Sequence, residues 1–245
     1  MLGGGTHREP EGGQRFPATA RHAGPGSARS TKKSGRSTHG TYQVRDRGAS
    51  RARTTARAAR GLTSSDQLLL VFGGSQRVRR FETALDGALA TLLTEWRVLH
   101  VVMDGLSEAE QRRASLPAEL RDRYEPVSFL GGGAMEAALV SADLMLGRAG
   151  ASTIAEAAAA GLPAIIVPYP FAGGHQRANA EAAAAAGAAT LINDEDLTPE
   201  RLLAAVATYA TRAQRATAAS AATTLAHPDA AVVIARTLTQ LGGRG

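Results

Sequence analysis

The sequence predicts an α/β fold, a parallel sheet flanked by helices, preceded by a disordered basic N-terminal segment. Residues 66–245 alternate short apolar runs with longer stretches of helical spacing, the pattern of strands and helices. Residues 1–65 carry 13 Lys and Arg against 3 Asp and Glu, and residues 66–245 carry 15 against 19, so the net charge of +6 is +10 plus −4. The segment 1–65 has almost no large apolar side chains, so it cannot bury enough surface to offset the conformational entropy lost on ordering.

Residues 66–245 are expected to form one domain. A chain of about 180 residues can bury roughly 70% of its unfolded surface in a single core. The sequence has no cysteine, which excludes disulfides, thiolate metal sites and a cysteine nucleophile. The uncharged stretch 157–174 contains three prolines and a glycine pair, so we do not expect it to cross a membrane.

The domain begins with a strand, a helix and a second strand. An apolar run predicts a strand over 67–72, helical spacing predicts a helix over 78–93, and a β-branched run predicts a strand over 97–103. The same pattern continues with helices near 106–114 and 134–142 and strands near 126–130 and 144–146.

The second half repeats this alternation and ends in helices. Helices are expected at 152–160 and 176–186, with strands at 163–167 and 188–192. Six strands separated by helices imply a parallel sheet with both faces covered. Three further helices are expected at 199–209, 213–225 and 229–241.

Ligands of such sheets bind beyond the carboxyl ends of the strands, so the turns there are the candidate site. The first turn carries Gly73, Gly74 and Ser75 directly after a strand. The glycines let backbone N–H groups approach an anion, and Ser75 can donate a hydrogen bond. A plain connection would have the same composition, and the turn matches neither a P-loop nor a dinucleotide fingerprint.

The second turn spans residues 148–156. Gly150 allows a tight turn, and Ser152 or Thr153 is expected to cap a helix whose first N–H groups face an anion. Alternatively, one of these hydroxyls forms a capping box with Glu156 and no ligand binds. Glu156 could instead accept hydrogen bonds from the vicinal hydroxyls of a ribose or sugar.

The third turn, residues 168–176, is stiffened by prolines and leads into a helix. His175 and Gln176 could contact a hydroxylated ligand. The alternative is that His175 caps the helix and Asn179 holds the loop in place.

Two charged clusters allow other interpretations. The acidic residues 194–196 are typical of a solvated approach to a helix rather than of a metal site. Three arginines could neutralise phosphate or form a charged helix face: Arg77, Arg79 and Arg80. The basic N-terminal segment could contact an anionic membrane surface, but it predicts no specific recognition of nucleic acid.

Together, in this order and spacing, these turns resemble the C-terminal, donor-binding half of family-28 glycosyltransferases. The resemblance covers roughly residues 67–240 and implies a Rossmann-like domain, the C-terminal half of a GT-B fold. The motifs that carry it are Val71-Phe72-Gly73-Gly74-Ser75-Gln76, Arg148-Ala149-Gly150-Ala151-Ser152-Thr153-Ile154-Ala155-Glu156, Gly161-Leu162-Pro163-Ala164 with Val167-Pro168-Tyr169-Pro170, and His175-Gln176 with Asn179-Ala180.

The resemblance implies a binding site for UDP-N-acetylglucosamine. By it, Glu156 would bind the ribose hydroxyls, and Gln176, with His175, the hydroxyls of the sugar. The backbone at Leu130 would read the uracil edge. The remaining residues would hold the diphosphate and the sugar at two turns: Gly73, Gly74 and Ser75, and Gly150, Ala151, Ser152, Thr153, Ile154 and Ala155.

The implied activity is inverting transfer of N-acetylglucosamine to a lipid-linked muramoyl-pentapeptide of peptidoglycan synthesis. The enzyme would work in the cytoplasm, peripherally at the inner face of the cell membrane, with no cofactor and no metal. No catalytic residue is identified. Residues 1–65 do not resemble the family's acceptor-binding domain, so we expect a truncated enzyme or a partner subunit that binds the acceptor. The alternatives are a related transferase with another nucleotide sugar or acceptor, and a noncatalytic binding or scaffold protein.

Overall fold

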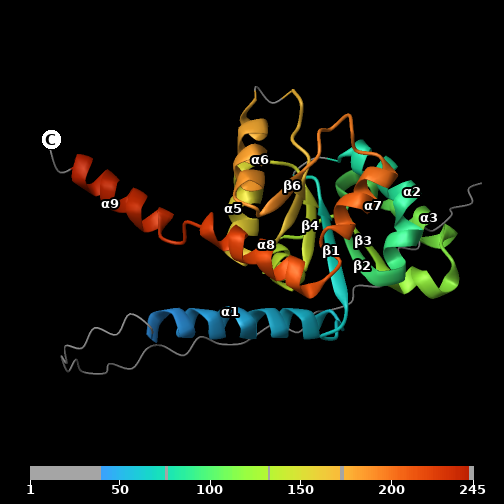
Figure 1. Ribbon diagram of the computed structural model, residues 1–245, viewed down its shortest axis with the longest axis horizontal. Coiled ribbons are helices and arrows are strands. Elements are labelled where there is room, and N and C mark those ends of the chain that lie inside the picture. The colour runs from blue at the N-terminus through green and yellow to red at the C-terminus, as the bar shows by residue number, and fades with distance from the viewer. Residues whose placement is uncertain (1–39, 75–76, 132, 172–173, 243–245) are drawn as a thin grey trace, which may run out of the picture. The chain divides into compact units, whose positions relative to one another are not determined.

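The computed structural model describes residues 40–74, 77–131, 133–171 and 174–242. Its centre is a six-stranded sheet in which every pair of neighbours is parallel, in the order β3-β2-β1-β4-β5-β6 (Figure 1). This confirms the predicted fold class. The strands are β1 (Gln67–Phe72), β2 (Trp96–Val101), β3 (Tyr124–Val127), β4 (Leu144–Gly147), β5 (Ala164–Ile166) and β6 (Ala189–Leu191).

Each helix expected after residue 66 is present, with its ends moved by a few residues. No helix among the described residues is long and apolar enough to cross a membrane. The helices are α2 (Arg79–Glu95), α3 (Leu106–Ser115), α4 (Gly133–Ser141), α5 (Ala151–Ala160), α6 (His175–Ala185), α7 (Pro199–Ala207), α8 (Arg212–Thr224) and α9 (Ala230–Gly242), with short 3₁₀ helices at Met103–Gly105 and Ala118–Arg123.

The sheet separates two apolar cores. Successive side chains of a strand point to opposite faces, so Leu69 and Val71 of β1 join one core and Leu68 and Leu70 join the other. The first core is covered mainly by α2 and α7, and the second by α4, α5 and α6. This double coverage explains why the strands are nearly continuous apolar runs.

The N-terminal helix α1 (Gly40–Ala59) was not expected from the sequence. From residue 50 onward it is bound to the domain, because the Asp143 carboxylate accepts from Arg53 at 2.6 Å and from Arg57 at 2.9 Å. Leu62, which follows the helix, is buried in the second core. The prediction of disorder is therefore wrong for residues 50–65, and for residues 1–39 it lies outside the described part of the chain.

A buried histidine makes the stability of the domain depend on pH. His100 of β2 is 3% exposed, and its Nδ1 lies 3.0 Å from the Tyr124 hydroxyl. Burial, and then the nearby charges of Arg112 and Arg77, lower the pKa of His100 from 6.5 to about 3. Between these values the unfolded chain binds a proton that the folded domain does not, so stability falls as pH falls.

We expect His100→Asn to remove this part of the pH dependence. The wild-type free energy of unfolding should fall faster than that of the variant below pH 6.5, by up to about 1.4 kcal/mol per pH unit. Urea denaturation at several pH values between 7 and 4 measures both curves. Parallel curves would show that His100 does not titrate in this way.

Candidate functional site

The three turns selected from the sequence leave the sheet side by side. Gly147 at the end of β4 is paired with Phe72 of β1 on one side and with Ile166 of β5 on the other. The Val167 N–H also donates to the Gly147 carbonyl at 2.9 Å. The turns that follow β1, β4 and β5 therefore begin at the same level of the carboxyl edge.

The first turn is suited to a close approach of the backbone to a ligand. Gly74 has a φ of +90°, in the left-handed region where a side chain would be strained. Gly73 lies between this residue and the end of β1. Ser75 and Gln76 lie outside the described residues, so the hydrogen bond expected from Ser75 stays a prediction.

The second turn presents the N-terminus of α5 without a side-chain cap. Gly150, and not Ser152 or Thr153, is the N-cap residue, and within the described part of the chain no side chain forms a cap hydrogen bond with this helix. The predicted capping by these hydroxyls is wrong, and so is the capping-box alternative. Gly150 takes the extended N-cap conformation, with ψ at 144°, which places Ala151, Ser152 and Thr153 already inside the helix. The N–H groups of Ala151, Ser152 and Thr153 carry the positive end of the helix dipole, whereas the Ile154 N–H already donates to the Gly150 carbonyl at 3.0 Å.

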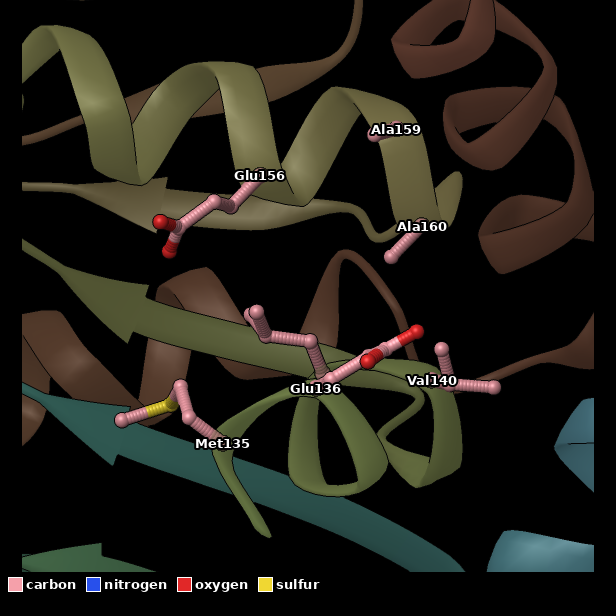
Figure 2. Close-up of a pocket in the computed structure, with 7 residues that line it drawn as sticks. Met135, Glu136, Val140, Glu156, Ala159 and Ala160 are labelled. Carbon is pink, nitrogen blue, oxygen red and sulfur yellow. The ribbon is translucent and has the colours of Figure 1, made fainter. Parts of the chain in front are cut away.

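Glu156 lies one turn further along α5, at the side of a groove of about 480 Å³ between α4 and α5. Its side chain is exposed and leaves α5 on the side that faces α4, with Met135 across the groove (Figure 2). Ala155 is its exposed neighbour nearer the N-terminus of the helix. The carboxylate is thus open to a ligand that lies against the start of α5.

The α4 wall of this groove was missed by the sequence analysis. Met135 and Glu136 line it together with Leu139 and Val140. Their spacing is helical and available from the sequence, but nothing local indicates that they face α5. Leu130, predicted to read a base through its backbone, lies in the segment between β3 and α4 and packs against the second core.

The third turn is fixed by hydrogen bonds to its neighbours. Gly174, with a φ of +81°, is the N-cap of α6, and His175 is the exposed first residue of the helix, so His175 does not cap it. The Gln176 side-chain oxygen accepts from the Tyr169 N–H at 2.9 Å, which leaves its amide nitrogen to donate. Asn179 donates to the Ala149 carbonyl at 3.1 Å, so it ties α6 to the second turn, and its expected role in holding the third turn stays a prediction.

The charged clusters are engaged within the protein only in part, because Arg79, Glu195 and Asp196 are exposed. The Asp194 side chain, 14% exposed, pairs with Arg148 at 2.6 Å and with Arg80 at 3.5 Å, so it is not the solvated residue that we predicted. Arg77 pairs with Glu82 and Glu108, which raises the pKa of its guanidinium. Across the described ranges, no group of three His, Cys, Asp or Glu side chains is placed to hold a metal ion.

The site therefore combines three kinds of group at one edge of the sheet. The start of α5 and the glycine turn offer N–H dipoles to an anion. Glu156 offers a carboxylate to hydroxyl groups, and Gln176 offers an amide nitrogen to further hydroxyls. Such an arrangement suits a ligand that has an anionic centre and a polyol on either side of it.

Comparison with known proteins gives a consistent result. The sequence model described as the glycosyltransferase family 28 C-terminal domain matches residues 68–234. A protein of Corynebacterium efficiens, named UDP-N-acetylglucosamine--N-acetylmuramyl-(pentapeptide) pyrophosphoryl-undecaprenol N-acetylglucosamine transferase, is 45% identical over 147 residues, which cover 60% of this chain and 38% of the relative. A protein of the same name from Saccharopolyspora erythraea is 36% identical over 201 residues, 81% of this chain and 51% of the relative.

The structural comparison agrees with the sequence comparison. A crystal structure of MurG from Acinetobacter baumannii superposes with a TM-score of 0.65 at 28% identity and covers 77% of this chain and 53% of that one. The chain thus spans about half the length of the relatives that it matches.

Proposed function

This chain belongs to glycosyltransferase family 28, and we propose that it binds UDP-N-acetylglucosamine as the donor for an inverting sugar transfer. The observation that carries this proposal is the meeting of the uncapped α5 N-terminus, the glycine turn after β1 and Glu156 at one edge of the sheet. The names of the relatives from Corynebacterium and Saccharopolyspora contain the same nucleotide sugar.

In the proposed complex the diphosphate lies against Gly73, Gly74 and the first turn of α5, residues 151–155. The ribose and the base then have separate partners. Glu156 accepts hydrogen bonds from the two ribose hydroxyls, and the uracil extends along the groove towards the backbone at Leu130. The exposed position of Glu156 and the groove beside it support this placement.

The sugar lies on the opposite side of the diphosphate, beside the start of α6. Gln176 donates through its amide nitrogen to a sugar hydroxyl, and the exposed ring of His175 contacts another. The hydrogen bond from Asn179 to the Ala149 carbonyl joins α6 to the second turn, which supports a fixed spacing between the sugar and the diphosphate.

This geometry would assist departure of the nucleotide. As the bond between the sugar C1 and the phosphate oxygen breaks, negative charge grows on the diphosphate. The N–H dipoles at the start of α5 are already oriented and stabilise this charge more strongly in the transition state than in the ground state. Departure of the nucleotide by this route does not require a covalent bond between the sugar and a side chain of the protein.

The acceptor and the general base are proposed to come from outside the donor site. Inversion requires a base beside the attacking hydroxyl, and we assign no residue of this chain to that role. By analogy with the relatives, whose names contain pyrophosphoryl-undecaprenol, the acceptor would be a lipid-linked muramoyl-pentapeptide at the cytoplasmic face of the membrane. An acceptor-binding half, in a longer chain or in a separate subunit, would complete the enzyme. The basic segment 1–65 would favour binding to an anionic membrane surface.

Competition among nucleotide sugars tests the donor assignment. We expect unlabelled UDP and UDP-N-acetylglucosamine to displace a fluorescent UDP derivative from the full chain, and dTDP-sugars to displace it poorly. Preferential displacement by dTDP-sugars would instead support a related transferase with another donor.

A further inference from the structure

Arg148 is a buried cation that the proposed donor contacts do not use. It follows β4 directly and is 9% exposed. Its Nη1 donates to the carbonyls of Val167 at 3.2 Å and Pro168 at 3.4 Å, and to the Asp194 carboxylate at 2.6 Å. One guanidinium thus joins the end of β4 to the turn after β5 and to the loop after β6.

The same guanidinium is also packed between two aromatic rings. Its central carbon lies 5.2 Å from the centre of the Phe81 ring in α2 and 5.5 Å from the centre of the Tyr169 ring. Both distances are within the range of a cation–π contact. Four segments of the carboxyl edge therefore meet at Arg148: its own turn, α2, the turn after β5 and the loop after β6.

We propose that Arg148 and Asp194 are positioning residues that set the sugar end of the donor site. This inference rests on the proposed function and deepens it. Arg148 fixes the backbone carbonyls at Val167 and Pro168, and the next residue, Tyr169, donates its N–H to Gln176. The orientation of the Gln176 amide, which would meet the sugar, therefore depends on a pair of residues that do not touch the ligand.

The contacts of Arg148 suit a guanidinium because they combine hydrogen bonds with packing against two aromatic rings. The planar guanidinium presents several N–H groups in a fixed fork and can stack on aromatic rings at the same time. All three hydrogen bonds leave from Nη1, so a lysine ammonium could still donate to some of these acceptors, but it is not planar and would lose the stacking on Phe81 and Tyr169. A loosened turn would then have to be ordered when the sugar binds, at a cost in affinity.

The test compares the affinity for UDP with that for UDP-N-acetylglucosamine in Arg148→Lys and Asp194→Asn. Arg201→Lys, the same change at an exposed arginine of α7, is the control. Calorimetric titration of full-length Arg148→Lys and Asp194→Asn should show a loss of about tenfold in affinity for the nucleotide sugar, the equivalent of one hydrogen bond, whereas Arg201→Lys should bind like the wild type. The affinity for UDP should stay within about twofold, since a positioning role on the sugar side leaves the nucleotide contacts in place.

Hydrogen exchange of the turn supplies a readout that needs no ligand. We expect the backbone amides of Val167, Tyr169, Phe171 and residues 174–177 to exchange faster in both variants than in the wild type and in Arg201→Lys. Equal losses of affinity for both ligands, or unchanged exchange and affinity in both variants, would overturn the positioning role. A folded wild-type protein that binds UDP equally well with or without the attached sugar would overturn the sugar assignment, whereas one that binds neither ligand would overturn the proposed function itself.

Discussion

Replacing Glu156 by glutamine should weaken the binding of both UDP and UDP-N-acetylglucosamine by about tenfold to a hundredfold. In the proposed complex the carboxylate accepts hydrogen bonds from two ribose hydroxyls, and bonds to a charged acceptor are stronger than bonds to an amide oxygen. Glutamine keeps the size of the side chain, so the groove between α4 and α5 should retain its shape. Calorimetric titration of the full-length variant measures the change for each ligand.

Glu136→Gln is the matched control for this experiment. Glu136 lines the same groove from α4, and its replacement removes the same charge near the ligand. We expect unchanged or slightly stronger binding, because a negative charge near the anionic diphosphate is removed. If the two variants behaved alike, the effect would be one of charge in the groove, and the ribose contact of Glu156 would be refuted.

Replacing Asp143 by alanine should lower the free energy of unfolding by about 2 to 4 kcal/mol. The carboxylate, 16% exposed, accepts from Arg53, from Arg57 and from the Leu68 N–H at 2.9 Å. The Arg57 side chain is 11% exposed and would lose its charged partner in a poorly hydrated position. The helix α1 should separate from the domain more readily in this variant.

Urea denaturation of full-length protein measures this loss. Asp122→Ala removes another aspartate that pairs with an arginine, but the Asp122 side chain is 93% exposed and its partner Arg113 lies at 3.4 Å. The control variant should change stability by less than about 0.5 kcal/mol, as is usual for an exposed pair. A comparable effect of the two substitutions would contradict the structural role given to Asp143.

The fold could be predicted from the sequence because its signals are local. The strands β1, β2, β4 and β5 are largely apolar runs that are buried almost throughout, and α2, α5 and α7 have a spacing that suits one covered face. The helix α1 has no comparable apolar stripe. It is held by ion pairs of Arg53 and Arg57 to Asp143, which is 90 and 86 residues away in the chain, and no local pattern reveals such a partner.

The site could be predicted only in part, for the same reason. The glycine turn after β1 and the start of α5 are readable as short motifs. Met135 faces Glu156 because of how α4 and α5 pack, and Arg148 pairs with Asp194, which is 46 residues away in the chain. No local pattern in the sequence indicates either contact. The predicted N-cap residues were wrong at two helices. Gly150 is the N-cap of α5 in place of Ser152 or Thr153, and Gly174 is the N-cap of α6 in place of His175.

The central claim is that this chain carries a working donor site, and a calorimetric titration of the wild-type full chain with UDP-N-acetylglucosamine tests it most directly. We predict saturable binding of one ligand per chain that is competed by UDP. A chain that is folded by circular dichroism, yet gives no binding heat and no protection against thermal unfolding at saturating ligand, would contradict the account.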